Sequence, residues 1–594
     1  MAVRFIGLVL LSVLDFVVAL ERGEYLDMSY GYDENSLAYP GAGFFQLTIE
    51  ERGPALGLPW LEYNSMCLPE HIGTHVDAPS HFGQGKMRID DIPLSRLICS
   101  AVRVDISEKA KADRDYGMTV KDLQDWEVIH GKIPDGSLLF VYTGWGAFYP
   151  DRLAYLGTKR NDTHLDDQGM SLVHCPGVGP EAAEWLVANR KIVGLGTDSA
   201  NIDRGLNVSF PTHRILMEAN IYGIENVANL DQLPDTGAKV FVLPMKIVDG
   251  SGAPARIVAM LNEDSTSGAA TLSTAFVTCV SLLTINLLVL TRVQNQGSNN
   301  MAARLPVHIT YLTLLGLVLS AALVGALKPG ELLDMTYVYD NETTLRWPGA
   351  PPFEQTILSR GPTPSMPWLE MNKISTAEHF GTHLDAPAHT AKGKWRTDEI
   401  PVENLIGPAV RVDVSSKAKA DVDYRLTQAD LTEWVSANGP IPAGALLFVY
   451  TGFGDYWSDR LQYFGYAGTD DYIDADGKSL LHFPGISVEA ATWLVENTKV
   501  TGVGIDTASL DFGQSLAFEA HQVLLTKNIF GLENVANLDQ LPTKGATVYA
   551  LPMKIWDGSG GPVRIIATGG SSLLQVDFAA LLLIGISMLL KTVI

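Results

Sequence analysis

His71-Ile-Gly-Thr-His75-Val-Asp77-Ala-Pro-Ser-His81 is the stretch on which the interpretation of this chain depends, and it returns as His379-Phe-Gly-Thr-His383-Leu-Asp385-Ala-Pro-Ala-His389. Each copy carries three histidines and one aspartate separated by even numbers of residues. Side chains alternate between the two faces of a strand, so these four groups share one face if the segment is extended. A helix would spread them around its axis, and Pro79 and Pro387 disfavour a helix interior. The spacing therefore predicts an extended run with three imidazoles and a carboxylate on one side.

Imidazole and carboxylate groups on one face form a ligand set that suits Zn²⁺, Mn²⁺ or Fe²⁺. The alternative is a scatter of surface histidines without a common role. The whole chain has 13 histidines, and six of them lie in these two short motifs, which a random scatter does not favour. The sequence therefore predicts a site for a metal or for proton transfer in each copy.

The neighbourhood of the motif is duplicated as well, at a constant offset. The segment from Gly223 to Pro234 returns as the segment from Gly531 to Pro542 with one changed residue. This period is far longer than that of solenoid repeats, which run to about 50 residues. Each copy spans roughly 240 residues, which suits one α/β domain. The sequence therefore predicts two tandem domains.

Charge and cysteine usage exclude several function classes. The formal net charge is −24, and no Lys/Arg-rich stripe is present, so a nucleic-acid partner is not expected. The four cysteines include none in the second domain. A disulfide therefore cannot be essential to the shared fold. Cys175 is replaced by Phe483 in the second copy, which argues against a catalytic cysteine.

Four apolar segments frame the two domains. The first and third have the pattern of secretory signal peptides, and the second and fourth follow small-residue runs typical of lipid-anchor signals. The expected order is a signal peptide at 1–20, a first domain at 24–262, a hydrophobic tail or transmembrane segment at 271–290, a second signal-like or transmembrane segment at 301–327, a second domain at 328–568 and a hydrophobic tail at 573–594.

Two explanations fit this order. The chain is either two neighbouring gene products merged into one, or a single polytopic protein with a short cytosolic loop between 290 and 304. Both place the two domains on the non-cytosolic side, in the secretory pathway, at the cell surface or outside the cell. Glycosylation sequons at Asn161, Asn207 and Asn341 agree with that location. A membrane contact through the tails or a lipid anchor is expected, and a homo-oligomer is allowed.

Short apolar runs and helical periods alternate within each copy. The runs 138–142 and 446–450 are typical of buried strands. A helix is expected from Pro180, which suits a first helical position, and a strand is expected at 192–198. Strand, helix and strand in this order predict an α/β domain with some parallel pairing.

The duplication also shows which distant polar residues the chain repeats. His213 and Glu225 recur as His521 and Glu533, although the residues around His213 do not recur well. A second histidine and a glutamate would complete one metal site or bridge two metals. His174 recurs too, and we interpret it as structural or as a support for metal ligands.

Taken together, these residues resemble the cyclase family, which includes bacterial-type kynurenine formamidases and isatin hydrolases. The pattern is His-x-Gly-Thr-His-x-Asp-x-Pro-x-His followed downstream by a histidine and, twelve residues later, a glutamate. The resemblance covers nearly all of both domains. It implies a swivelling β/β/α fold, duplicated here, with a divalent metal, one or two Zn²⁺ per domain or Mn²⁺.

The resemblance also implies a role for each matched residue. The two last motif histidines, His81 and His389, would transfer protons as catalytic residues. The family tryptophan that contacts substrate matches Trp347, whereas the first domain has Tyr39 there. The implied metal ligands are His71, His75, Asp77, His213 and Glu225 in the first domain and His379, His383, Asp385, His521 and Glu533 in the second.

The implied activity is metal-dependent hydrolysis of a carbon–nitrogen bond in a small aromatic amide. The leading expectation is an arylformamidase that converts N-formyl-kynurenine to kynurenine and formate. The alternatives are a cyclic-amide hydrolase of the isatin type, or a non-catalytic cell-surface binding protein. A site that no longer turned over would not need matched polar groups in both copies, which favours an enzyme.

Overall fold

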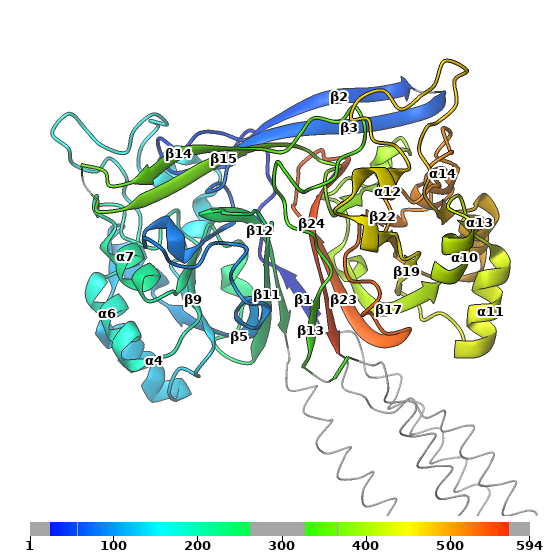
Figure 1. The fold of residues 1–594 in the computed structure, drawn as a ribbon. Helices are drawn as coiled ribbons and strands as arrows, with labels where there is room; N and C mark the ends of the chain where they lie inside the picture. Colours follow the sequence, from blue (N-terminus) through cyan, green and yellow to red (C-terminus); the bar gives the residue numbers. More distant parts are fainter. Residues whose placement is uncertain (1–23, 56, 262–326, 329, 365, 570–594) are drawn as a thin grey trace, which may run out of the picture.

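The computed structural model describes residues 24–55, 57–261, 327–328, 330–364 and 366–569, and two similar modules lie side by side in it (Figure 1). The expected segments at 1–20, 271–290 and 573–594 lie outside the described residues, as does 301–327 apart from its last residue. Among the described residues, none of the helices has both the length and the apolar character needed to span a bilayer.

A closed ring of seven strands forms the centre of the first module. Its order is β12-β11-β5-β7-β9-β10-β4, and β4 pairs back onto β12, while β1 is added outside β12. These strands are β1 (Glu24–Asp27), β4 (His75–Asp77), β5 (Ile98–Asp105), β7 (Leu138–Tyr142), β9 (Gly194–Thr197), β10 (Tyr222–Glu225), β11 (Ala238–Pro244) and β12 (Gly252–Leu261).

The second module repeats this ring in the order β24-β16-β22-β21-β19-β17-β23, with β23 paired back onto β24 and β13 added outside. Its strands are β13 (Leu332–Asp334), β16 (His383–Asp385), β17 (Ile406–Asp413), β19 (Leu446–Tyr450), β21 (Gly502–Ile505), β22 (Phe530–Glu533), β23 (Lys544–Pro552) and β24 (Gly560–Gly569). The predicted duplicated α/β fold is therefore confirmed.

Helices lie on the outer side of each ring (Figure 1). α4 begins at a capping box in which Thr119 and Asp122 each bond the other's backbone N–H, and it buries Leu123 and Trp126. The helix expected from Pro180 is α6. The longer helices are α4 (Val120–His130), α6 (Pro180–Asn189) and α7 (Pro211–Glu218), and α11 (Gln428–Asn438), α13 (Val488–Asn497) and α14 (Glu519–Leu525); shorter ones are α2 (Leu94–Leu97), α3 (Ser107–Ala112), α5 (Arg152–Leu156), α10 (Ser415–Ala420) and α12 (Arg460–Phe464).

Two long hairpins join the modules into one sheet. β2 (Gln46–Ala55) and β3 (Leu58–Pro69) belong to the first module, and β14 (Glu354–Gly361) and β15 (Leu369–Ala377) to the second. β3 pairs antiparallel with β15, so the four strands form the sheet β14-β15-β3-β2. Figure 1 shows each hairpin reaching across towards the other module.

The barrels also contact each other directly. The rings of Phe241 and Tyr549 stack with centroids 3.9 Å apart. Asp27 binds Arg256 of its own module and Lys554 of the other, at 2.9 and 2.8 Å. The second module repeats this arrangement around Asp334.

These carboxylates predict acid-sensitive stability. Burial opposes ionisation of Asp27, but Arg256 and Lys554 outweigh it and lower the pKa of Asp27. Its stabilising contribution is therefore present above the unfolded pKa and is lost as pH falls through the lower folded value. We expect Asp27→Asn to lower the free energy of unfolding by about 1–2 kcal/mol at pH 7, because a charge-assisted contact is lost. Urea titrations at pH 7 and at pH 3 should show a smaller difference between variant and parent at pH 3.

Candidate metal centres

Strand pairing brings the motif and the distant glutamate together. β4 lies between β10 and β12, and His75 stands directly opposite Glu225 in the antiparallel register. Asp77 stands opposite Gly223, where an added Cβ would lie 2.9 Å from the Asp77 carboxylate. The glycine therefore leaves room for the carboxylate above it.

The motif is extended over only part of its length. His75–Asp77 is strand β4, but Pro79–His81 is one turn of 3-10 helix. Before β4 the chain also bends, and Gly73 has a φ of 55° in the left-handed region. The prediction of a fully extended run is therefore wrong on both sides of β4. Pro79 supplies the fixed φ that suits a first helical position, and the turn brings the His81 ring to within 3.9 Å of the His71 ring, measured between centroids.

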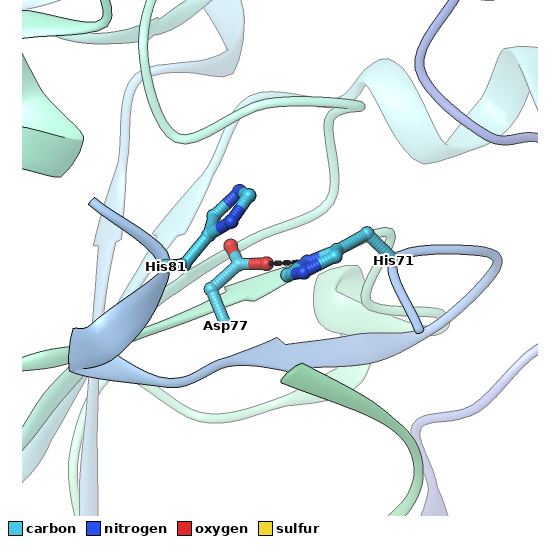
Figure 2. A group of neighbouring side chains, drawn as sticks. All are labelled: His71, Asp77 and His81. Atoms are coloured by element: carbon cyan, nitrogen blue, oxygen red, sulfur yellow. Dashed lines mark hydrogen bonds and ion pairs between the residues drawn. The ribbon is translucent and has the colours of Figure 1, made fainter. Parts of the chain in front are cut away.

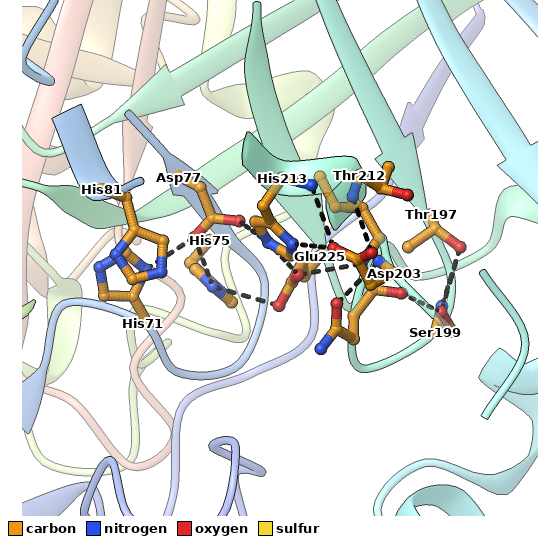
Figure 3. Close-up of polar contacts among 12 residues, drawn as sticks. His71, His75, Asp77, His81, Thr197, Ser199, Asp203, Thr212, His213 and Glu225 are labelled. Atoms are coloured by element: carbon orange, nitrogen blue, oxygen red, sulfur yellow. Dashed lines mark hydrogen bonds and ion pairs between the residues drawn. The ribbon is translucent and has the colours of Figure 1, made fainter. Parts of the chain in front are cut away.

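Four side chains form the inner cluster of the first site (Figure 3). His75 Nε2 lies 3.1 Å from Asp77 Oδ1 and 3.7 Å from Glu225 Oε2. His213 Nε2 lies 3.1 Å from Glu225 Oε1 and 3.5 Å from Asp77 Oδ2. All four side chains are buried.

Outer contacts fix which nitrogen of each imidazole faces the cluster. His75 Nδ1 lies 2.9 Å from the Gly73 carbonyl oxygen, which can only accept, so Nδ1 carries the proton and Nε2 faces the carboxylates. His213 Nδ1 lies 2.7 Å from Asp203. A carboxylate or carbonyl behind the imidazole is the usual support for a metal-ligating histidine.

The donor set fits a divalent cation. His75 Nε2 and Asp77 Oδ2 are buried without a hydrogen-bond partner among the described residues. Burial alone would lower the pKa of His75, but Asp77 and Glu225 outweigh it and raise that pKa to about 9. The cluster therefore places two buried carboxylates against imidazole nitrogens, and a bound cation would compensate the negative charge of these carboxylates.

His71 and His81 lie beside this cluster (Figure 2). His71 Nδ1 lies 2.6 Å from Asp77 Oδ1, and its Nε2 lies 3.0 Å from Ser251 Oγ. His81 Nδ1 lies 2.6 Å from the carbonyl oxygen of Glu370, so Nδ1 carries a proton and Nε2 is left as an acceptor. Burial and the neighbouring His71 lower the pKa of His81 well below its usual value.

Glu370 belongs to the other module, so each site is completed across the interface. Its side chain is buried and bound by Arg88 at 2.6 Å and by Arg360 at 2.7 Å. Trp368 Nε1 donates to the Ser80 carbonyl oxygen at 3.0 Å, next to His81. The hairpin of the second module therefore positions the turn that carries His81.

The second site repeats this geometry. Asp385 and Glu533 face His383 and His521 at 3.0–3.3 Å. His389 Nδ1 lies 2.6 Å from the carbonyl oxygen of Glu62 in the first module. The structure thus brings together every ligand expected from the sequence. Groups of side chains that could hold a metal occur in both modules: His71, Asp77 and His81; His75, Asp77 and Glu225; His379, His383 and Asp385; Asp385, His521 and Glu533.

Sequence reasoning missed three supporting residues in each copy. Asp203 holds His213, and Ser251 contacts His71 and donates to the buried Glu70 carboxylate at 2.7 Å. They recur as Asp511, Ser559 and Glu378, so the comparison of the two copies contained the signal.

Glu70 marks a difference between the modules. Gln355 donates to it at 2.9 Å, whereas Leu47 takes the corresponding place in the first module. Glu378 Oε1 is buried without a partner among the described residues.

Aromatic rings link the predicted substrate positions to the distal histidine of each site. The Tyr39 ring lies 5.6 Å from that of Phe210, and the Trp347 ring lies 6.2 Å from that of Phe518. Phe210 and Phe518 have φ values of 48° and 47°, a conformation that bulky residues rarely adopt. Each precedes the helix that carries the distal histidine, and its ring lies 5.8 or 5.7 Å from that histidine. This strained backbone sets the aromatic ring against the cluster.

His174 lies apart from the site. It is partly exposed, and its Nδ1 lies 2.8 Å from Asp115. His482 contacts Asp423 at the same distance. Cys67 and Cys175 are free thiols, and burial raises the pKa of Cys175.

Comparisons with known proteins bear on the family to which the chain belongs. The cyclase family model, described as "Putative cyclase", matches residues 26–204 and 333–512. An isatin hydrolase from Roseibium aggregatum is 35% identical over 211 residues, which cover 34% of this chain and 76% of that protein. A kynurenine formamidase from Salinibacter ruber is 27% identical over 225 residues, covering 38% of this chain and 91% of that protein.

Solved structures include an isatin hydrolase bound to the product analogue thioisatinate. It is 30% identical, and the match covers 43% of this chain and 98% of that one, with a TM-score of 0.38. The family expected from the motifs is confirmed by the match of both modules to the family model. The chain belongs to the cyclase family, as two tandem copies.

Proposed function

We propose that each module is a metal-dependent amidohydrolase that cleaves a carbon–nitrogen bond in a small aromatic amide. The observation that carries this proposal is the buried cluster of two carboxylates and two imidazoles beside His81 in the first module, repeated in the second. The relatives of this chain include a kynurenine formamidase and an isatin hydrolase. The leading activity is that of an arylformamidase, with N-formyl-kynurenine as the substrate, and the kynurenine formamidase relative supports this choice.

The proposed cation is Zn²⁺ or Mn²⁺, held by His75, Asp77, His213 and Glu225, with His71 at the edge of the set. It supplies positive charge that polarises the amide carbonyl and makes water a better nucleophile. The protein fixes the imidazoles through Gly73 and Asp203. Burial excludes competing water and strengthens each electrostatic contact.

His81 is the proposed proton carrier. Its Nδ1–H is committed to the Glu370 carbonyl oxygen, so Nε2 is free to accept a proton from the attacking water. The same nitrogen then protonates the departing amine, which leaves as a neutral group. His389 has the same role in the second module.

A cyclic-amide hydrolase is the second candidate, because the isatin hydrolase relative is 35% identical. The two activities differ in what is attached to the scissile carbonyl: hydrogen in a formamide, and the ring's own carbon in isatin. Metal analysis of the whole chain with parallel formanilide and isatin assays distinguishes them. A metal-free protein inactive on both would instead indicate a binding protein.

The double variant His81→Ala and His389→Ala tests the proton carriers. We expect the metal content to be retained and kcat to fall by about 10²–10⁴-fold, the usual contribution of general acid–base catalysis. Elemental analysis and kinetics on the same preparation provide both measurements. Loss of metal would make these histidines ligands and would contradict the role proposed for them.

A further inference from the structure

The two sites differ at one position next to the proton carrier. Phe82 follows His81, and Thr390 follows His389. Their backbone angles nearly coincide, with φ and ψ of −117° and −4° for Phe82 and −119° and 5° for Thr390. Their Cβ atoms therefore project in equivalent directions, and only the side chain differs.

Phe82 fills the space beside the reacting groups of the first site. Its ring centroid lies 4.3 Å from that of His81 and 4.8 Å from that of His213. It also contacts Phe210, at 5.3 Å. Met366 of the second module belongs to the same buried apolar cluster. In the first site a phenyl ring therefore packs against both a proposed ligand and the proposed proton carrier.

Thr390, which stands at the equivalent position of the second site, has a shorter and polar side chain. It is 3% exposed, and its Oγ1 has no hydrogen-bond partner among the described residues. Among those residues, the rings that contact His521 belong to Phe518 and His389. The second site thus lacks the phenyl wall and has an unpaired buried hydroxyl in its place.

The other side of each site shows the opposite change. Tyr39 and His164 face each other in the first site, with ring centroids 5.4 Å apart. Trp347 and Tyr472 take their places in the second site. Trp347 also contacts Phe483, which replaces Cys175. The second site has therefore gained aromatic bulk away from the proton carrier and lost it beside the carrier.

We propose that Phe82 and Thr390 make the two sites select different amides, with the second site accepting a larger group on the scissile carbonyl. This inference rests on the amidohydrolase function proposed above. The carbonyl of the substrate must lie near the ligand cluster, and Phe82 occupies the space next to it in the first site. A formyl group carries only hydrogen there, so it fits both sites. An acetyl or ring carbon meets Phe82 in the first site and the smaller Thr390 in the second.

Apolar contacts discriminate only modestly between substrates of different size. One carbon more or less in a closely packed site changes kcat/KM by roughly 10–200-fold. We therefore expect the preference for formanilide over acetanilide to be at least about tenfold stronger in the first site. Thr390 Oγ1 would donate to a substrate carbonyl such as the second carbonyl of isatin.

The test uses the full chain with one site silenced at a time. Glu533→Gln leaves the first site active, and Glu225→Gln leaves the second. Each form is assayed with formanilide, acetanilide, isobutyranilide and isatin. Phe82→Thr is added to the first form and Thr390→Phe to the second. We expect these substitutions to exchange the acyl-group profiles of the two sites.

Thr390→Val is the matched control, because it keeps the volume and removes the hydroxyl. We expect it to keep the ratio of acetanilide to formanilide turnover within about threefold, since acyl size is set by space. Melting temperature and metal content check that each variant is folded. Should a silenced form be unstable, Thr390→Phe alone in the unsilenced chain is expected to lower that ratio.

Two results would overturn the inference in distinguishable ways. If both single-site forms hydrolyse the panel with the same profile, the sites are equivalent and the amidohydrolase function still stands. If neither form hydrolyses any member, both the function and the inference fail. An exchange of profiles by Phe82→Thr and Thr390→Phe supports the inference.

Discussion

Replacing Asp77 and Asp385 together by Ala is expected to empty both metal sites and to lower kcat by about 10²–10³-fold or more. The reason is that a catalytic metal stabilises the transition state by several kcal/mol. Asp77 lies within 3.5 Å of three histidines, His71, His75 and His213. Its loss leaves these buried imidazoles without the carboxylate that they share. Elemental analysis should show about half of the metal in Asp77→Ala alone, because each module has its own site.

A suitable control is Asp125→Ala, which removes an exposed carboxylate paired with Lys121 on the surface of α4. It changes the net charge of the chain in the same direction and should leave metal content and kcat near the parent values. Full metal occupancy in the double variant would contradict the assignment of Asp77 and Asp385 as ligands.

Replacing Glu370 by Ala is expected to impair the first site, although Glu370 belongs to the second module. With the second site silenced by Glu533→Gln, we expect kcat to fall by about 10–100-fold, the usual effect of losing a residue that orients catalytic groups. Glu370 anchors Arg88 and Arg360 and holds His81 through its backbone carbonyl. Losing the buried carboxylate should also lower the free energy of unfolding by about 1–3 kcal/mol, because two charge-assisted contacts are lost. The loss should not be larger, because both arginines are partly exposed to water.

The comparison variant is Glu354→Ala, an exposed glutamate at the start of the same hairpin. It tests whether any loss of charge on the β14–β15 hairpin has the same effect. The decisive measurement is which of the two sites loses kcat in the Glu370→Ala variant. In the Glu225→Gln background, where only the second site works, Glu370→Ala should change kcat much less. Equal losses in both backgrounds would show a general folding defect instead of a contribution across the interface.

The residues of the ligand cluster were predictable because chemistry and repetition both pointed to them. The even spacing of His75 and Asp77 placed them on one face, and β4 does so. His213 and Glu225 stood out because they recur where their neighbours do not. The end of the motif was not predictable from spacing alone, because Pro79 starts a turn in place of a longer strand.

The pairing of the two hairpins across the modules was not predictable from the sequence in the same way. Trp60 and Trp368 recur, but nothing local to them indicates that each donates to a carbonyl of the other module, at 3.0 Å. The pairing of β3 with β15 joins segments separated by about half of the chain. Local propensity carries no information about such a pairing, since a strand fits many partners equally well.

The unequal surroundings of Glu70 and Glu378 bear on how the halves combine. Gln355 donates to Glu70 across the interface, and Leu47 is the residue of the first module that corresponds to Gln355 in the sequence. A self-pair of first halves would bring leucine to both carboxyls, and a self-pair of second halves would bring glutamine to both. The chain instead combines one of each, so tethering fixes a mixed assembly in which the two catalytic units are free to diverge from each other.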